Sequence, residues 1–268
     1  MRVALGQFGA SSDKAANLSR MVTMAGRARA FGADLVLFPE GAMVAFGPGR
    51  SLVPAAEPLE GPFVGGLAHA AREHRLTVVA GVYETVPGSE RVYNSVVALG
   101  PDGSLIGFYR KIHLFDAFGY RESDRIEPGA GDTLVFEQGG LTFGVETCYD
   151  VRFPELSRHL ADQGVQVILL PAAWVHGLLK ESHWQILVRA RAVENTVFVA
   201  AAGQVGAPYS GSSMLVDPMG VAVAAAGEDE EVVAAEVDPR RVETVRRKLP
   251  SREHVRPDIY RGWALVAR

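Results

Sequence analysis

The residue best suited to chemistry in this chain is a single cysteine at the end of an apolar run. Cys148 is the only cysteine among 268 residues. The run 141–147 before it has the β-rich character of a buried strand, and Pro154 can begin a helix that Gly164 ends. Cys148 is therefore predicted at a strand-to-helix turn, on the carboxyl edge of a sheet where α/β proteins build their clefts. A thiol there is either a nucleophile or, like many lone cysteines, a small buried hydrophobe.

Two other strand-like runs end in residues that could activate this thiol. Residues 33–38 lead to Glu40, and residues 105–109 lead to Lys111. A thiol has an ordinary pKa of roughly 8.5, so a nucleophilic Cys148 needs a neighbouring base or cation. In acyl transfer from an amide, the carboxylate would take the thiol proton and return it to the departing amine, while the ammonium would hold the oxyanion. Each group also has a structural alternative, because the glutamate can simply end a strand and the lysine can be a surface cation.

Other residues complete this arrangement or compete with it. The backbone N–H of Tyr149 is the expected second oxyanion donor. The seven histidines leave open a Cys-His pair as in thiol proteases, with His113 or His183 as the base, although nothing local supports it. No histidine spacing suits a metal site, and no P-loop or dinucleotide-binding glycine motif is present. We therefore expect neither a metal nor a cofactor.

Composition places the chain among ordinary globular proteins. Hydrophobic residues make up 48% of the chain and charged residues 22%. A net charge of −4 provides no overall positive electrostatic field that would attract nucleic acid. No apolar segment approaches bilayer length, and the first residues turn polar too soon for a signal peptide. One cysteine cannot form an intrachain disulfide, so a reducing cytoplasm is the expected compartment. At this length the whole chain, 1–268, is expected to be one domain.

Alternating strands and helices must position the candidate residues. Apolar spacing predicts helices at residues 18–25, 63–71, 154–164 and 180–195. The mixture of parallel crossovers and hairpins indicates mixed sheets with helices outside, in a layered α/β fold. The polar stretch 112–131 is expected to be a loop beside the pocket. Strands are expected near residues 2–8, 34–38, 76–84, 93–99, 105–109, 133–137, 141–147, 165–170, 197–202, 212–216 and 221–225.

Three motifs in this order resemble the nitrilase superfamily, also called the carbon-nitrogen hydrolases. They are residues 38–40 (FPE), 109–116 (YRKIHLFD) and 148–155 (CYDVRFPE), and the resemblance runs over nearly the whole chain. Further matches are residues 171–174 (PAAW), 183–184 (HW), 190–195 (ARAVEN) and 217–220 (DPMG).

The resemblance implies a four-layer α-β-β-α sandwich with two mixed β-sheets. In the family, the residues that match Glu40, Lys111 and Cys148 form the catalytic triad, and a second glutamate, which matches Glu122, orients the lysine. The resemblance further implies a homodimer or higher homo-oligomer, with a C-terminal tail from about 249 to 268 packing on the partner subunit.

Within the superfamily, the second and third motifs resemble the branch that contains ω-amidase and deaminated glutathione amidase. This implies hydrolysis of a small linear carboxamide to carboxylate and ammonia through a cysteine thioester, rather than nitrile hydrolysis. Tyr149, Arg152 and Trp174 are candidate substrate-binding residues, and Arg152 either pairs with a substrate carboxylate or forms an ion pair with Glu155 or Asp150. Two alternatives stay open: hydrolysis of N-carbamoyl amines or amino acids, and a non-catalytic binding domain on the same fold.

Two departures from that branch bear on specificity. The loop between Phe115 and Glu122 is shorter and lacks the usual Ile-Pro-Gly segment. Glu146 stands where these relatives tend to carry a small or apolar residue, and strand alternation places it on the same side as Cys148. An extra anion there would disfavour an acidic acyl group, so a neutral or cationic amide is the expected substrate. The alternative is that Glu146 is paired with an arginine or points away.

Overall fold

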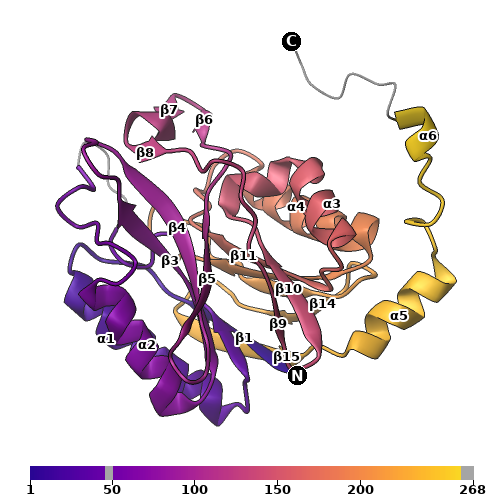
Figure 1. Cartoon of the computed structure of the whole chain (residues 1–268), viewed down its shortest axis with the longest axis horizontal. Coiled ribbons are helices and arrows are strands. Elements are labelled where there is room, and N and C mark those ends of the chain that lie inside the picture. Colours follow the sequence, from indigo (N-terminus) through magenta and orange to yellow (C-terminus); the bar gives the residue numbers. More distant parts are fainter. Residues whose placement is uncertain (46–50, 261–268) are drawn as a thin grey trace.

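Two β-sheets packed face to face form the centre of the protein (Figure 1). The structure is a computed structural model that describes residues 1–45 and 51–260. Apolar side chains from both sheets share one core, for example Val3 and Leu5 of the first sheet with Phe143 and Leu169 of the second. Because successive residues of a strand point to opposite faces, Ala4 packs instead with the helices on the outer side.

The first sheet has seven strands in the order β15-β1-β2-β3-β4-β5, with β8 beside β4. β1, β2 and β3 are parallel and are connected through helices, whereas β4 and β5 extend the sheet as antiparallel hairpins. β15, which the sequence pattern did not predict, pairs antiparallel with β1. The strands are β1 (Arg2–Gln7), β2 (Leu35–Leu37), β3 (Thr77–Thr85), β4 (Val92–Leu99), β5 (Leu105–Arg110), β8 (Ile126–Glu127) and β15 (Glu231–Glu236).

The second sheet has six strands in the order β14-β13-β12-β11-β10-β9. Its three central members, β10, β11 and β12, are parallel, and their buried, almost entirely apolar sequences suit strands covered on both faces. The strands are β9 (Val135–Gln138), β10 (Leu141–Val145), β11 (Val167–Ala172), β12 (Phe198–Gly203), β13 (Met214–Val216) and β14 (Ala222–Ala225).

Helices cover the outer face of each sheet, which gives four layers. α1 (Lys14–Ala30) and α2 (Pro62–His74) pack on the first sheet, and α3 (Pro154–Asp162) and α4 (Lys180–Asn195) pack on the second (Figure 1). The Asp13 side chain caps α1, and prolines occupy the first turns of α2 and α3, where their missing N–H is tolerated. The predicted four-layer α-β-β-α sandwich with two mixed sheets is confirmed.

The stretch 112–131, predicted to be a loop, contains short ordered elements. β6 (Asp116–Ala117) and β7 (Tyr120–Arg121) form a small hairpin, and the 3₁₀ turn η1 (Glu122–Asp124) follows it. The hairpin therefore leads directly to Glu122, the predicted lysine-orienting residue.

The C-terminal segment leaves the two-sheet body (Figure 1). α5 (Pro239–Lys248) packs on the body through Val242 and Val245, whereas α6 (Pro257–Tyr260) has no buried residue. Of the predicted tail, residues 261–268 lie outside the described part of the chain. Within the described residues, no helix combines the length and apolar character needed to cross a bilayer.

Candidate active site

Three side chains that follow the ends of three strands meet at one edge of the two sheets. Glu40 follows β2 and Lys111 follows β5, both in the first sheet, while Cys148 follows β10 in the second. Lys111 Nζ lies 2.8 Å from Glu40 Oε1, and the Cys148 thiol is hydrogen-bonded to the Glu40 carboxylate. The structure thus brings together the three residues that the sequence analysis singled out.

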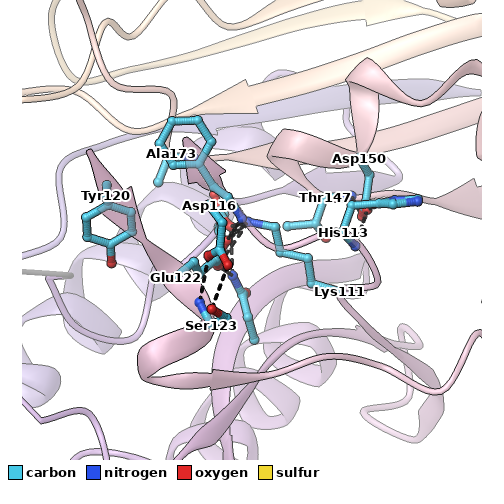
Figure 2. A network of polar contacts seen from close by, with 12 residues as sticks. Lys111, His113, Asp116, Tyr120, Glu122, Ser123, Thr147, Asp150 and Ala173 are labelled. Atoms are coloured by element: carbon cyan, nitrogen blue, oxygen red, sulfur yellow. Dashed lines mark hydrogen bonds and ion pairs between the residues drawn. The ribbon is translucent and has the colours of Figure 1, made fainter. Parts of the chain in front are cut away.

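Glu122 holds the lysine from a second direction. Its carboxylate oxygens lie 3.0 and 2.8 Å from Lys111 Nζ (Figure 2). The Phe115 N–H donates to the same carboxylate at 2.6 Å, and the Asn94 Nδ2 donates to Glu40 at 2.7 Å and to Glu122 at 3.2 Å. The ammonium is therefore fixed between two anions, each of which is itself held by further donors.

A backbone N–H and a side-chain amide from residues that follow strands of the second sheet hold Glu40. The Ala173 N–H, just after β11, donates to Glu40 Oε2 at 2.8 Å, and the Gln204 side-chain amide donates to the Glu40 carbonyl at 2.7 Å. Gly81 packs so closely on Glu40 and Gly41 that a Cβ there would lie 2.7 Å from Glu40 Cα. The Glu40 carboxylate is thus held in place from both sheets.

The chain turns sharply at the cysteine. Cys148 begins the 3₁₀ turn η2 (Cys148–Arg152) and has a φ of 46°, in the left-handed region that costs a non-glycine residue roughly 1–3 kcal/mol. Thr147 caps the turn, and its N–H donates to Asp150 Oδ2 at 2.9 Å. This conformation aims the thiol away from the strand and toward Glu40.

Asp150 also connects the cysteine turn to the segment that carries the lysine. Its carboxylate accepts hydrogen bonds from Tyr109 Oη at 2.7 Å and from the His113 N–H at 3.0 Å, and His113 Nδ1 lies 2.7 Å from the same oxygen (Figure 2). Tyr109 and His113 lie two residues before and after Lys111. A single fully buried carboxylate therefore connects the segment of Lys111 to the turn of Cys148.

Burial and neighbouring charges decide the protonation of each group. Burial would raise the pKa of Glu40, but the Lys111 charge and hydrogen bonds hold it below its ordinary value. Burial, and then the Glu40 charge, raise the pKa of the Cys148 thiol well above its ordinary value despite Lys111. Burial would lower the pKa of Lys111, yet the charges of Glu122 and Glu40 hold it well above its ordinary value. These directions favour an ionised Glu40 carboxylate, a neutral Cys148 thiol and a charged Lys111 ammonium near neutral pH.

The thiol faces a cavity of about 490 Å³. Glu40, Lys111, Glu122 and Cys148 all line it, and so do Tyr149 and Trp174, two of the predicted substrate-binding residues. Aromatic side chains form much of the remaining wall, namely Phe115, Phe118, Tyr120 and Tyr209. A largely apolar cavity with a few convergent polar groups is the usual form of a small-molecule site.

Arg152 lies behind the cavity wall rather than in it. Its guanidinium covers the ring of Trp174, 4.8 Å from the centroid, and lies 6.0 Å from the ring centroid of Tyr149. Its Nε and Nη2 atoms are buried without a hydrogen-bond partner. Among the described residues, neither Glu155 nor Asp150 forms an ion pair with it, so the structural ion pair considered for Arg152 is not seen.

Glu146 lies away from the cavity, which corrects its predicted place beside the substrate. The side chain is fully buried, and its Oε2 accepts a hydrogen bond from Ser157 Oγ of α3 at 2.6 Å. Strand alternation fails here because β10 ends at Val145 and the chain then turns. Burial raises the pKa of Glu146 to about 7. The expectation of a neutral or cationic amide, which depended on an anion beside the thiol, therefore loses its basis.

The histidines considered as alternative bases do not line the cavity. The His113 ring stacks on Phe153 with centroids 3.7 Å apart and faces Asp150, and His183 lies within α4 with its Nδ1 buried and unpartnered. In the parts of the chain that the structure describes, no cluster of three or more His, Cys, Asp or Glu side chains could hold a metal ion.

Three residues that shape the site were not predicted to belong to it. Asn94 is a polar side chain within the apolar strand β4, and that break in the pattern was the available signal. Asp150 was considered only as part of a motif and as a possible ion-pair partner of Arg152. Lys180 begins α4 and lines the cavity, but nothing in the sequence distinguishes it from a surface lysine.

The carbon-nitrogen hydrolase family model matches residues 2–247. The chain therefore belongs to this family, within the nitrilase superfamily, and is a hydrolase of carbon–nitrogen bonds other than peptide bonds. The resemblance predicted from the three motifs is confirmed.

Individual relatives cover almost the whole chain. It is 38% identical to the deaminated glutathione amidase of Escherichia coli O157:H7, over 93% of this chain and 95% of that protein. It is 36% identical to omega-amidase NIT3 of Saccharomyces cerevisiae, over 97% of this chain and 94% of that protein. The crystal structure of S. cerevisiae Nit3, a member of branch 10 of the nitrilase superfamily, superposes with a TM-score of 0.84 at 32% identity, covering 93% of this chain and 94% of that one.

Proposed function

We propose that this protein is an amidase that hydrolyses a small linear carboxamide to a carboxylate and ammonia through a thioester on Cys148. The observation that carries the proposal is the position of the Glu40 carboxylate, which is hydrogen-bonded to both the Cys148 thiol and Lys111 at the cavity. The names of the relatives, a deaminated glutathione amidase and an omega-amidase, support an amide as the substrate.

Acylation begins with a neutral thiol, because its pKa is raised. As the Cys148 sulfur attacks the amide carbon, Glu40 takes the thiol proton, so the thiolate need never accumulate. Lys111 Nζ and the Tyr149 N–H hold the developing oxyanion, a type of contact worth roughly 3 kcal/mol per donor. Glu40 then gives the proton to the leaving nitrogen, ammonia departs, and the acyl group remains on sulfur.

Deacylation uses the same base a second time. Glu40 takes a proton from a water molecule, and the oxygen attacks the thioester carbon. The carbon–sulfur bond breaks, the proton returns to the sulfur, and the carboxylate product leaves. Glu122 has a positioning role throughout, because it holds the lysine by two contacts while Glu40 changes its protonation.

The walls of the cavity orient the acyl group. Tyr149 and Trp174 present apolar faces beside the thiol, and the Arg152 guanidinium supports the Trp174 ring from behind. Aromatic walls exclude water and strengthen the electrostatic contacts to the reacting carbonyl.

Trapping the acyl-enzyme tests the proposal directly. Purified protein is incubated with a panel of small amides, keto-acid amides and N-carbamoyl compounds, while ammonia release is followed and the intact mass is measured after rapid acid quenching. We expect ammonia together with a mass increase on the Cys148 peptide, and neither in Cys148→Ala. Equal amounts of carbon dioxide and ammonia would instead identify a carbamoylase. Unchanged turnover in Cys148→Ala would overturn the nucleophile assignment.

A further inference from the structure

Asn94 is a buried polar side chain that contacts all three charged residues of the site. It belongs to β4, is 2% exposed and lines the cavity. Its Nδ2 donates to Glu40 Oε1 at 2.7 Å and to Glu122 Oε1 at 3.2 Å, and its backbone carbonyl accepts from the Lys111 N–H at 2.9 Å. The residue is thus connected to the base and to the lysine, although no step of the proposed reaction uses it.

Packing alone does not explain an asparagine at this position. The other end of the amide, Oδ1, is buried and has no hydrogen-bond partner among the described residues. A buried acceptor without a partner costs free energy, and asparagine is poorly suited to the interior of a strand. A valine or threonine would occupy the strand at lower cost. What the asparagine adds is its pair of N–H contacts to the two carboxylates.

The Lys111 ammonium has as many carboxylate contacts as it has N–H groups. Three carboxylate oxygens lie within 3.0 Å of Lys111 Nζ, one from Glu40 and two from Glu122. An ammonium has three N–H donors, so turning one toward an oxyanion withdraws it from a carboxylate. Because Asn94 Nδ2 and Lys111 Nζ contact the same oxygen of Glu40, that oxygen keeps a donor when the ammonium turns away.

The charges around the amide explain why a neutral donor is needed. Glu40 and Glu122 present two carboxylates to one ammonium. The Cys148 thiol and the Tyr83 phenol, which also line the cavity, stay neutral near neutral pH because burial raises the pKa of each well above its ordinary value. Burial would also raise the pKa of Glu40, but the lysine and hydrogen bonds, including that of Asn94, hold it below its ordinary value. The amide thus supports the base without adding a charge.

We propose that Asn94 is a positioning residue of the reaction, a neutral donor that holds the Glu40 carboxylate beside the thiol while Lys111 turns an N–H group toward the oxyanion. This inference rests on the proposed amidase function. Asn94 holds the base when it takes the proton of the thiol and again when it takes a proton from water. The lysine returns its N–H group to Glu40 when the carboxylate product leaves.

Asn94→Asp separates this role from packing, because aspartate has nearly the same shape and can gain a charge. At acid pH the new carboxyl group shares a proton with Glu40 and can donate a hydrogen bond to it, as the amide does. At higher pH that proton is lost, and a third carboxylate faces the single ammonium. Relative to the wild type at each pH, kcat/KM for ammonia release by Asn94→Asp should therefore fall roughly tenfold or more from about pH 5.5 to about pH 8.

Two alanine variants complete the comparison. Asn94→Ala removes the donor at every pH, so kcat should fall about 10- to 100-fold with little change in KM and no new pH dependence. Ser95→Ala is the matched control, because Ser95 is the next residue of β4, is also buried, and donates from Oγ to Glu84 at 2.8 Å. Ser95→Ala should keep the kcat and the pH profile of the wild type. Recovery of Asn94→Asp at acid pH would show that this variant is folded.

Alkylation of Cys148 by iodoacetamide gives a second measurement that needs no amide. The added anion of Asn94→Asp should move the alkylation midpoint to higher pH, and Ser95→Ala should leave it unchanged. A wild type that releases ammonia from no amide would refute the proposed function, and the alkylation midpoints would still test the place of Asn94. A pH-independent ratio of Asn94→Asp to wild type, an unmoved midpoint, or equal losses in Asn94→Ala and Ser95→Ala would overturn the role of Asn94.

Discussion

Glu40 affects the thiol in two opposing ways. In the proposed reaction it acts as a base and accelerates attack, but its charge also raises the pKa of Cys148. In Glu40→Gln we therefore expect turnover to fall by roughly 10³-fold while the thiol ionises more readily. The pH profile of iodoacetamide alkylation measures this, and its midpoint should move to lower pH. An unchanged or higher midpoint would show that the two side chains are not in contact.

Glu146 should make the stability of the protein depend on pH. Its pKa is about 7 in the folded state and about 4.5 when exposed, so protonation stabilises the fold below pH 4.5 and that stabilisation is lost as pH rises to 7. When the pH rises from 5 to 8, the free energy of unfolding of the wild type should fall by about 2–3 kcal/mol more than that of Glu146→Gln. Urea unfolding at both pH values measures the difference. Parallel pH profiles of the two proteins would contradict a raised pKa.

At the level of side chains, the residues that follow the ends of strands could be predicted from the sequence. Glu40, Lys111 and Cys148 could be predicted because an apolar run that stops at a polar residue places that residue at a sheet edge. Glu146 was misplaced because alternation holds only while the strand continues, and β10 ends one residue earlier. Lys180 could not be predicted, because two of its aromatic neighbours, Phe115 and Phe118, come from a segment far away in the chain.

Among the elements, η2 depends most on a single carboxylate. Asp150 accepts hydrogen bonds from three separate positions in the described chain, all of them N–H or O–H donors. Asp150→Asn turns one acceptor into a donor, so we expect a loss of about 2–4 kcal/mol in the free energy of unfolding and a marked fall in kcat. Tyr109→Phe removes only one of these hydrogen bonds and should cost about 1 kcal/mol.

Denaturant unfolding and steady-state kinetics of both variants test this connection. If Asp150→Asn unfolds like the wild type and turns over normally, the turn is held by the backbone alone. A fall in kcat with little change in KM would show that Asp150 acts by placing the nucleophile and the lysine.

The elements that could be predicted are those with long apolar patterns. The central strands and the four covering helices all lie near their predicted positions. β15 was missed because its sequence, EVVAAE, is short and weakly apolar, and pairing with β1 decides its conformation. The hairpin of β6 and β7 was missed because two-residue strands carry no periodicity.

For the whole molecule, we propose that the C-terminal segment binds a second copy of the chain. Leu249, Val255 and Ile259 are each about 40% exposed on a segment that extends from the body (Figure 1). Exposed large apolar side chains on one segment favour association. Light scattering after size exclusion should give a dimer or larger assembly, and truncation after Lys248 should weaken it. A monomer at all concentrations, or an assembly unaffected by truncation, would contradict the proposal.

The antiparallel pairing of β15 with β1 has a consequence for synthesis of the chain. β1 (Arg2–Gln7) is synthesised long before its antiparallel neighbour β15 (Glu231–Glu236). Until β15 has been made, β1 has an unpaired edge with which other nascent chains could pair. Arrival of residues 231–236 closes that edge, so this side of the first sheet is protected from self-association only after β15 has been synthesised.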